Sequence, residues 1–307
     1  MHAELINRMK GIIVALSTPL TAQGSLDEAG AERLVESVIT NGVSCIFPLG
    51  WCGEGPLLTD RVRRDTMKSV CRLARGRVPL MVGVSEQSLP RVEELLRVAE
   101  AAGADCVLAT MPYSYELSQQ LVYTFFEGLS RLTKLPIVIY ENSELGVFIG
   151  IDCLKKLSEI ENIIGVKATV PAGNLRSYYE QLHNPDHFAV ISGDEYLYDY
   201  ALLMGFRHFT MGGPGNICAR WCTSMYEDAV AGRVLDVMQK QAQLVAFLTA
   251  VYGTSDSAYS VIKYVLARMG ICEDRISSPH RTLTVDEQAE ADAVLGKHQQ
   301  ILDGPLV

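Results

Sequence analysis

Eight short apolar runs recur along the first three quarters of the chain, and this repetition constrains the fold more than any other feature. The runs are 11–17, 45–50, 78–84, 105–111, 136–141, 163–169, 188–193 and 208–213. Amphipathic segments separate them, and capping residues precede four: Ser25 or Asp27 before 28–40, Thr59 before 60–74, Ser88 before 90–102 and Ser118 before 119–132. Because each parallel strand needs a crossover connection, this alternation predicts an α/β fold, a (β/α)8 TIM barrel.

A doubly wound open sheet is the structural alternative. It normally has fewer units, and the first strand-to-helix turn here has no GxGxxG fingerprint for a dinucleotide. After residue 230 the strand-like runs end, and 233–250, 257–269 and 284–302 have helical patterns. We therefore expect a catalytic barrel over residues 1–230 and a C-terminal helical extension over residues 231–307.

The composition narrows the class of protein. A net charge of -9 over 307 residues argues against nucleic acid as a partner, because phosphate binding needs a basic face. The N-terminus lacks a signal peptide and no apolar run is long enough to span a membrane, so a cytoplasmic protein is expected. The eight cysteines form no CxxC pair, which indicates reduced thiols in the core. We expect neither a metal site nor a cofactor.

A lysine stands inside the apolar run 163–169. A buried ammonium is costly, and a lysine that becomes neutral is a nucleophile that can form a Schiff base with a ketone. The alternative is that Lys167 extends to solvent or pairs with a carboxylate. The residues at the neighbouring strand ends therefore have to show whether Lys167 is a nucleophile or a solvated or paired lysine.

Active sites of such barrels lie at the carboxyl ends of the strands. The run before Lys167 ends with Tyr140, and a phenol beside the amine can move protons as the imine forms. The turn Gly50–Gly55 can expose backbone N–H groups that hold a carboxylate. Together these parts predict a site for a 2-oxo acid. Alternatively, Tyr140 is a core residue and Gly50–Gly55 is only a tight turn.

These residues resemble the dihydrodipicolinate synthase and N-acetylneuraminate lyase family of class I aldolases. The resemblance covers nearly the whole chain. It rests on segments 11–19, 50–54, Pro112-Tyr113, Tyr140, 165–169, 192–195 and 278–283. Residues 50–54 stand where the family has its G-[ST]-T-G-E loop. It implies that Lys167 forms the imine, that Tyr140 is the general acid and base, and that the backbone of 50–53 holds the substrate carboxylate. It also implies a homotetramer built from dimers.

The chain departs from the family pattern at several places. Trp51 and Cys52 replace two hydroxyl residues of the loop, so a side-chain hydroxyl that normally relays protons is missing. Ser114 stands where the synthases place a second relay tyrosine. The segment after Tyr140 has no arginine where the synthases bind the carboxylate of their aldehyde, which argues against lysine biosynthesis.

Other residues resemble the sialic-acid lyase branch. Leu145-Gly146-Val147 is closer to that branch, and Asp194 and Glu195 match its pair of acids that bind sugar hydroxyls. The alternative for Asp194 is that it caps the next helix.

The sequence thus predicts a Schiff-base lyase or synthase that cleaves or forms a carbon–carbon bond, with a 2-oxo acid such as pyruvate and an aldehyde as its small-molecule partners. Three alternatives stay open: a dehydratase of a 2-keto-3-deoxy sugar acid, a 4-hydroxy-tetrahydrodipicolinate synthase, and a non-catalytic barrel that binds 2-oxo acids. Lys167 and Tyr140 are the predicted catalytic residues. The predicted substrate-binding residues are Gly50, Trp51, Cys52, Gly53, Tyr113, Ser114, Thr169, Asp194, Glu195 and Gly213.

Overall fold

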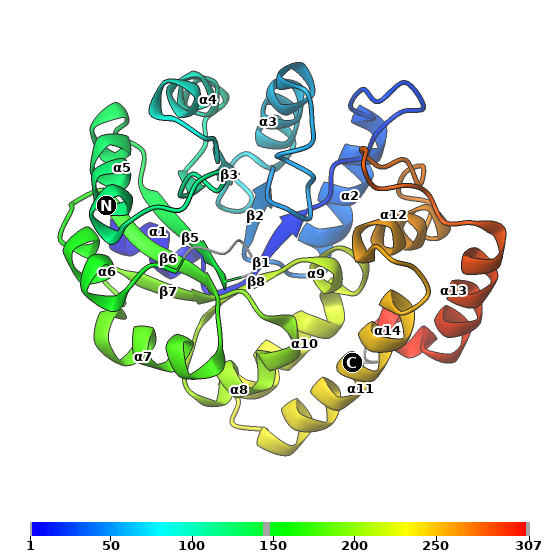
Figure 1. Ribbon diagram of the computed structural model, residues 1–307. Coiled ribbons are helices and arrows are strands. Elements are labelled where there is room, and N and C mark those ends of the chain that lie inside the picture. The colour runs from blue at the N-terminus through cyan, green and yellow to red at the C-terminus, as the bar shows by residue number, and fades with distance from the viewer. Residues whose placement is uncertain (1, 144–147, 305–307) are drawn as a thin grey trace.

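The sheet closes on itself, as the run pattern predicts. The computed structural model describes residues 2–143 and 148–304, and within them eight parallel strands have the order β2-β1-β8-β7-β6-β5-β4-β3. β1 pairs with both β2 and β8, and a parallel bridge from Ile46 to Leu80 joins β2 to the segment before β3. An open doubly wound sheet is therefore excluded (Figure 1). The strands are Gly11–Leu16, Cys45–Pro48, Met81–Gly83, Cys106–Thr110, Ile137–Asn142, Ile163–Thr169, Ala189–Ser192 and His208–Met211, for β1 to β8.

The strands are buried on both faces, which explains their apolar and β-branched sequences. Seven of them are buried at every residue, and β6 is buried from Ile163 to Ala168. Close packing between β6 and β7 depends on Gly165, where a Cβ atom would lie 2.5 Å from the carbonyl oxygen of Ala189. The continuous apolar runs in the sequence thus correspond to strands that pack against the core on both faces.

Helices surround the barrel (Figure 1). Asp27, Thr59 and Ser118 accept N-cap bonds as expected, whereas Ser88 makes no side-chain cap bond. The helices are α1 His2–Arg8, α2 Glu28–Thr40, α3 Asp60–Ala74, α4 Leu89–Ala102, α5 Gln119–Leu132, α6 Ile151–Ser158, α7 Ala172–Leu182, α8 Tyr198–Leu203, α9 Gly213–Ile217, α10 Ala219–Val230, α11 Val234–Tyr252, α12 Ala258–Arg268, α13 Val285–Lys297 and α14 Gln299–Asp303, with a 3-10 helix, η2, at Glu195–Leu197.

The N-terminal helix α1 was not expected from the sequence. It covers the amino-terminal end of the strands, where His208, the first residue of β8, donates a hydrogen bond from Nε2 to the Ile6 carbonyl at 2.8 Å. Burial lowers the pKa of His208 to about 4, so its ring is neutral at neutral pH. α1 therefore closes the barrel at the end opposite the predicted site.

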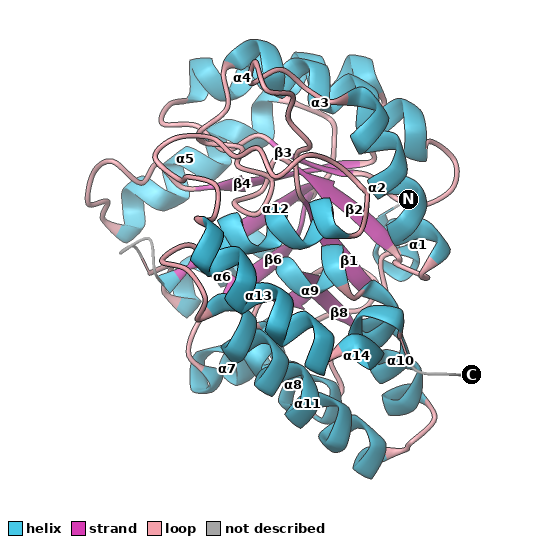
Figure 2. Cartoon of the chain, turned by 90° about the vertical axis from the view of Figure 1, so that its right-hand side faces the viewer, coloured by secondary structure: helices cyan, strands magenta, loops and turns pink. Residues whose placement is uncertain are grey.

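The last helices lie together on one side of the barrel (Figures 1 and 2). The expected helix 284–302 is two helices, α13 and α14, which meet at His298. α11 packs on α8 and α10, and α12 packs on α9. No helix among the described residues is long and apolar enough to cross a membrane.

Candidate active site

A cavity of about 450 Å³ opens at the carboxyl ends of the strands, where the barrel rule places the site. Its walls come from β5, β6, the segments after β2, β7 and β8, and helices α11 and α12. The side chains used below that line it are Trp51, Cys52, Tyr140, Lys167, Glu195 and Tyr252.

Lys167 and Tyr140 meet in this cavity. They are paired in the register of β5 and β6, and the Lys167 Nζ lies 3.7 Å from the centroid of the Tyr140 ring. The Lys167 Nζ also donates to Thr169 Oγ1 at 3.2 Å, and only 6% of Lys167 is exposed. Asn142 Nδ2 donates to the Tyr140 hydroxyl at 3.0 Å, which leaves the phenol proton available to a substrate.

A glycine after β7 makes room for the amine. A Cβ atom at Gly193 would lie 3.0 Å from Lys167 Nζ and 2.5 Å from Thr169 Oγ1. The Thr169 hydroxyl donates to the Gly193 carbonyl at 3.3 Å, which orients its oxygen toward the amine. The glycine thus sets the space in which Lys167 can react.

The loop after β2 is folded tightly. Leu49 and Glu54 have positive φ angles of 64° and 59°, a strained conformation for residues with side chains. A Cβ atom at Gly53 would lie 2.6 Å from the Leu16 carbonyl oxygen. Within the described residues, the backbone N–H groups of Trp51 and Cys52 bond to no protein group, so they remain available to an anion.

A buried ion pair holds this loop. Lys263 Nζ on α12 lies 3.0 Å from Glu54 Oε1, and both side chains are almost fully buried. The same ammonium donates to the carbonyls of Thr18 and Arg275, the latter at 2.9 Å. Glu54 Oε2 accepts the Ser277 N–H at 2.6 Å. The C-terminal helices thereby fix the geometry of the loop.

Trp51 forms an aromatic wall. Its ring packs edge-on against Tyr140, with centroids 5.4 Å apart, and against Tyr113, with centroids 5.8 Å apart. Trp51 and Tyr140 line the cavity, whereas Tyr113 stands behind Trp51. An indole at this place supplies an apolar face instead of a hydroxyl.

The Cys52 thiol faces the cavity in its neutral form. Burial raises its pKa to about 12, and Ser17 Oγ lies 3.7 Å from Sγ. Asn216 Nδ2 donates to the same sulfur at 3.6 Å. Cys52 is therefore neither a thiolate nucleophile nor an efficient proton donor at neutral pH.

The two adjacent acids have different surroundings. Asp194 Oδ1 accepts the Tyr196 N–H at 2.9 Å and caps η2, so the capping alternative holds for this oxygen, while Asp194 also lines the cavity. The Tyr252 hydroxyl approaches Glu195 Oε1 at 3.5 Å. Tyr252 reaches this place because position 213 is glycine, where a Cβ atom would lie 1.7 Å from its hydroxyl.

Not every predicted site residue lies in the cavity. Trp51, Cys52, Tyr140, Lys167, Thr169, Asp194, Glu195 and Gly213 line it, whereas Gly50, Gly53, Tyr113 and Ser114 do not. Ser114 is exposed, and its N–H bonds to Gln87 Oε1 at 3.0 Å. Leu145-Gly146-Val147 lies outside the described residues. No cluster of three or more metal-ligating side chains occurs in the described part of the chain.

Among the lining residues that the sequence analysis did not predict, Asn142, Gly193 and Tyr252 make the contacts described above. Asn142 could have been found, because it follows Tyr140 by two positions on a strand and so shares its face. Gly193 stood within a recognised segment but was not assigned a role. Nothing local identifies Tyr252, which reaches the cavity from α11.

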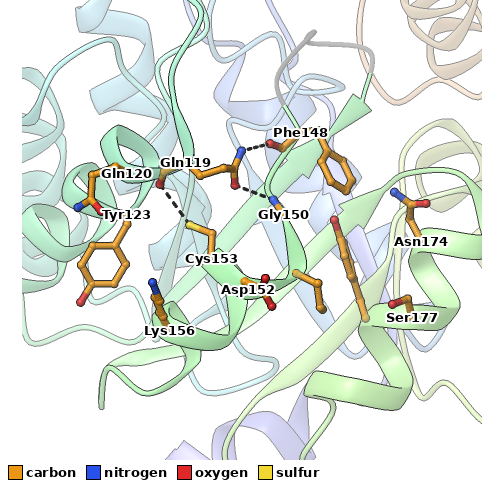
Figure 3. A pocket seen from close by; sticks show the side chains of 12 residues that line it. Gln119, Gln120, Tyr123, Phe148, Gly150, Asp152, Cys153, Lys156, Asn174 and Ser177 are labelled. Carbon is orange, nitrogen blue, oxygen red and sulfur yellow. Dashed lines mark hydrogen bonds between the residues drawn. The ribbon is translucent and has the colours of Figure 1, made fainter.

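A second hollow, of about 840 Å³, lies outside the barrel between α5, α6 and α7 (Figure 3). Gln119 spans it by donating to the Phe148 carbonyl and accepting the Gly150 N–H, both at 2.7 Å. Its lysine, Lys156, lies near the end of α6, and neither Lys167 nor Tyr140 borders it. We therefore assign the chemistry to the smaller cavity, which holds the paired lysine and tyrosine.

Comparisons with known proteins agree with this geometry. The model of the dihydrodipicolinate synthetase family matches residues 8–298. A 4-hydroxy-tetrahydrodipicolinate synthase from Chloroherpeton thalassium is 31% identical over 302 residues, which cover 94% of each chain. The dihydrodipicolinate synthase structure from Bacteroides thetaiotaomicron has a TM-score of 0.89 at 27% identity and covers 94% of this chain and 98% of its own. YagE from E. coli K12, solved in complex with pyruvate, has a TM-score of 0.87 at 25% identity with the same coverage. The chain belongs to the dihydrodipicolinate synthetase family of Schiff-base lyases and synthases.

Proposed function

We propose that this protein is a class I aldolase that joins pyruvate to an aldehyde, or cleaves the corresponding product, through an imine on Lys167. The observation that carries the proposal is the amine of Lys167 above the ring of Tyr140, in a cavity at the carboxyl ends of the strands. The pyruvate complex of the relative YagE supports the choice of 2-oxo acid.

Each residue has a role in this scheme. The neutral Lys167 amine attacks the ketone carbon of pyruvate, and loss of water gives the imine. Tyr140 moves protons at the nitrogen and at the pyruvate methyl group, since its hydroxyl keeps a free proton. The unpaired N–H groups of Trp51 and Cys52 hold the pyruvate carboxylate. Gly50 and Gly53 contribute by shaping the turn.

We propose that the aldehyde is less charged than aspartate semialdehyde. Trp51 lies at the cavity wall where a hydroxyl residue is usual in the family, and its ring favours an apolar or weakly polar partner. Asp194 and Glu195 can accept hydrogen bonds from a polyol. Both features disfavour a second carboxylate.

A second candidate is 4-hydroxy-tetrahydrodipicolinate synthase, because the relatives from Chloroherpeton thalassium and Phenylobacterium zucineum carry that name. A dehydratase of a 2-keto-3-deoxy sugar acid would use the same imine but expel water. A non-catalytic barrel is disfavoured by Lys167 and Tyr140 meeting in one cavity.

The test has two stages. Borohydride reduction with pyruvate, followed by intact mass measurement, should add one pyruvate-derived group to the chain. Then kcat/KM is compared for D-glyceraldehyde, benzaldehyde and aspartate semialdehyde at fixed pyruvate. A kcat/KM for aspartate semialdehyde of about 10⁴ M⁻¹s⁻¹ or more, above both other aldehydes, would favour the second candidate. Release of a dehydrated keto acid without pyruvate from a 2-keto-3-deoxy sugar acid would favour the dehydratase.

We further propose a cytoplasmic homotetramer in which residues 1–230 form the catalytic barrel and residues 231–307 a helical extension. Exposed apolar side chains support subunit contacts, and they gather where α10 leads into α11, at Val230, Val234, Leu235 and Met238. A single mass by light scattering near four times that of the chain is expected, and a monomer would contradict this assembly.

A further inference from the structure

Glu195 places a carboxyl group in the cavity that holds Lys167, where the segments after β7 and β8 and helix α11 meet. In the sheet, β6 lies between β5 and β7, so Tyr140 on β5 and Glu195 just after β7 come from the two strands next to that of Lys167. Glu195 lines the cavity, as do both other residues. A substrate bound to Lys167 would therefore share one cavity with two proton-transfer groups, the Tyr140 phenol and the Glu195 carboxyl.

The Glu195 carboxyl is held by neighbours but not neutralised by them. Tyr252 OH lies 3.5 Å from Oε1, and a Cβ atom at Gly212 would lie 3.4 Å from Oε2. Burial raises the pKa of Glu195 to about 7, while the Gly212 backbone lowers it, Asp194 raises it, and Lys167 and Tyr252 lower it. The other ionisable groups that face it are Cys52, Tyr196 and Cys218. Both protonation states are thus populated near neutral pH.

The reaction needs a proton at a second place. When the enamine carbon attacks an aldehyde, the aldehyde oxygen becomes an alkoxide that must be protonated. Tyr140 is engaged at the imine end, Trp51 has no hydroxyl, and burial keeps the Cys52 thiol protonated with a pKa of about 12. The loop after β2 therefore supplies no efficient donor.

We propose that Glu195 is the proton-transfer group for the oxygen of the aldehyde partner. In condensation, Tyr140 first takes a proton from the methyl group of the imine to give the enamine. The carbon–carbon bond then forms between that carbon and the aldehyde carbon, and a proton passes from the Glu195 carboxylic acid to the aldehyde oxygen. In cleavage, the Glu195 carboxylate takes the proton from that hydroxyl as the carbon–carbon bond breaks. Cleavage leaves the enamine of pyruvate, Tyr140 returns a proton to its methylene carbon, and water then hydrolyses the imine on Lys167. This assignment of separate proton transfers to Tyr140 and Glu195 rests on the aldolase function proposed above.

The role gives opposite pH dependences to the two directions. Condensation needs the protonated acid, so this contribution is present below about pH 7 and is lost as the pH rises through the raised pKa of Glu195. Cleavage needs the carboxylate, so it is lost as the pH falls through the same value. A residue that only anchors a sugar hydroxyl would change KM without removing either limb of the profile.

The experiment compares Glu195→Gln with the wild type in two reactions. One is condensation of pyruvate with whichever of D-glyceraldehyde, benzaldehyde and aspartate semialdehyde has the highest kcat/KM. The other is hydrogen–deuterium exchange at the pyruvate methyl group, followed by NMR, which needs the imine and Tyr140 but no aldehyde. We expect condensation to fall by about 10²–10⁴-fold, at least about tenfold more than exchange, together with loss of the limb near pH 7.

Glu141→Gln is the matched control. Burial also raises the pKa of Glu141 to about 7, but its carboxyl points to the helix side of β5, where Tyr178 OH lies 3.0 Å from Oε1. This variant should keep the limb near pH 7.

Equal losses in exchange and condensation, or a limb that persists in Glu195→Gln, would overturn the proposal. If an imine is trapped and the methyl group exchanges but none of the three aldehydes is consumed, there is no aldol step for Glu195 to serve. The proposal then fails while the imine chemistry stands. If no imine is trapped, the proposed function itself fails.

Discussion

Among the described residues, Lys167 and Lys263 are both buried, yet their ammonium groups have different surroundings. Lys263 forms an ion pair with the Glu54 carboxylate and donates hydrogen bonds to the carbonyls of Thr18 and Arg275, so protein groups surround its ammonium. Lys167 bonds to the Thr169 hydroxyl and otherwise faces the Tyr140 ring and the cavity. Burial alone therefore does not make a lysine a nucleophile; what matters is a nitrogen whose neighbours leave it free to react.

The largest effect is expected from removing the free amine. Lys167→Ala should abolish borohydride trapping and turnover, because no other described lysine lies in the cavity. Intact mass after reduction with pyruvate measures the trapping, and circular dichroism checks the fold. If the imine were trapped in the variant as fully as in the wild type, the nucleophile would lie elsewhere. The surroundings of Lys167 and Lys263 would then not explain which lysine reacts.

Tyr140→Phe should sharpen the comparison by keeping the ring over Lys167 while removing the proton donor. The aromatic contact at 3.7 Å stays, so the imine should still be trapped. Turnover should fall by about 10²–10⁴-fold, as is typical for loss of a general acid or base. Steady-state rates across the pH range measure this, and an unchanged rate and pH profile would remove Tyr140 from the mechanism.

Lys263→Met should act on stability. It leaves the Glu54 carboxylate buried without its ion pair, which should lower the free energy of unfolding by about 3–5 kcal/mol. Urea unfolding measures the change, and the double variant Lys263→Met with Glu54→Gln should recover part of it because the uncompensated charge is gone. A single variant as stable as the wild type would show that the ion pair is not what holds the loop.

The sequence predicted what depends on neighbours along the chain. Periodic apolar runs predicted the barrel. Lys167 and Tyr140 were predicted as site residues because Lys167 stands inside one run and Tyr140 near the end of the run before it, and the place of each run in the sheet follows from chain order. Glu54 was part of a recognised loop, but its partner Lys263 was not predicted, since the pair forms between the loop after β2 and α12. Tyr252 and the close approach at Gly193 likewise depend on packing between distant segments.

The Gly50–Gly55 turn was predicted as a cradle on composition, and the structure qualifies that interpretation. Gly50 and Gly53 pack against Phe47 and the Leu16 carbonyl, so their lack of side chains serves the tight fold of the loop. The residues of this turn that line the cavity are Trp51 and Cys52, whose N–H groups bond to no described protein group. A motif recognised by its glycine content thus pointed to a loop that borders the cavity, whereas which of its N–H groups face the cavity depends on backbone geometry that residue type does not encode.

The ion pair between Glu54 and Lys263 also has a consequence for how the protein is made on the ribosome. Glu54 is synthesised early, whereas Lys263 on α12 and the Ser277 N–H that completes its contacts emerge late. A nascent chain that has released all eight strands still lacks the charge that balances this carboxylate. The loop that borders the cavity therefore lacks its buried ion pair until α12 has left the exit tunnel, and we expect this part of the molecule to reach its final geometry late in folding.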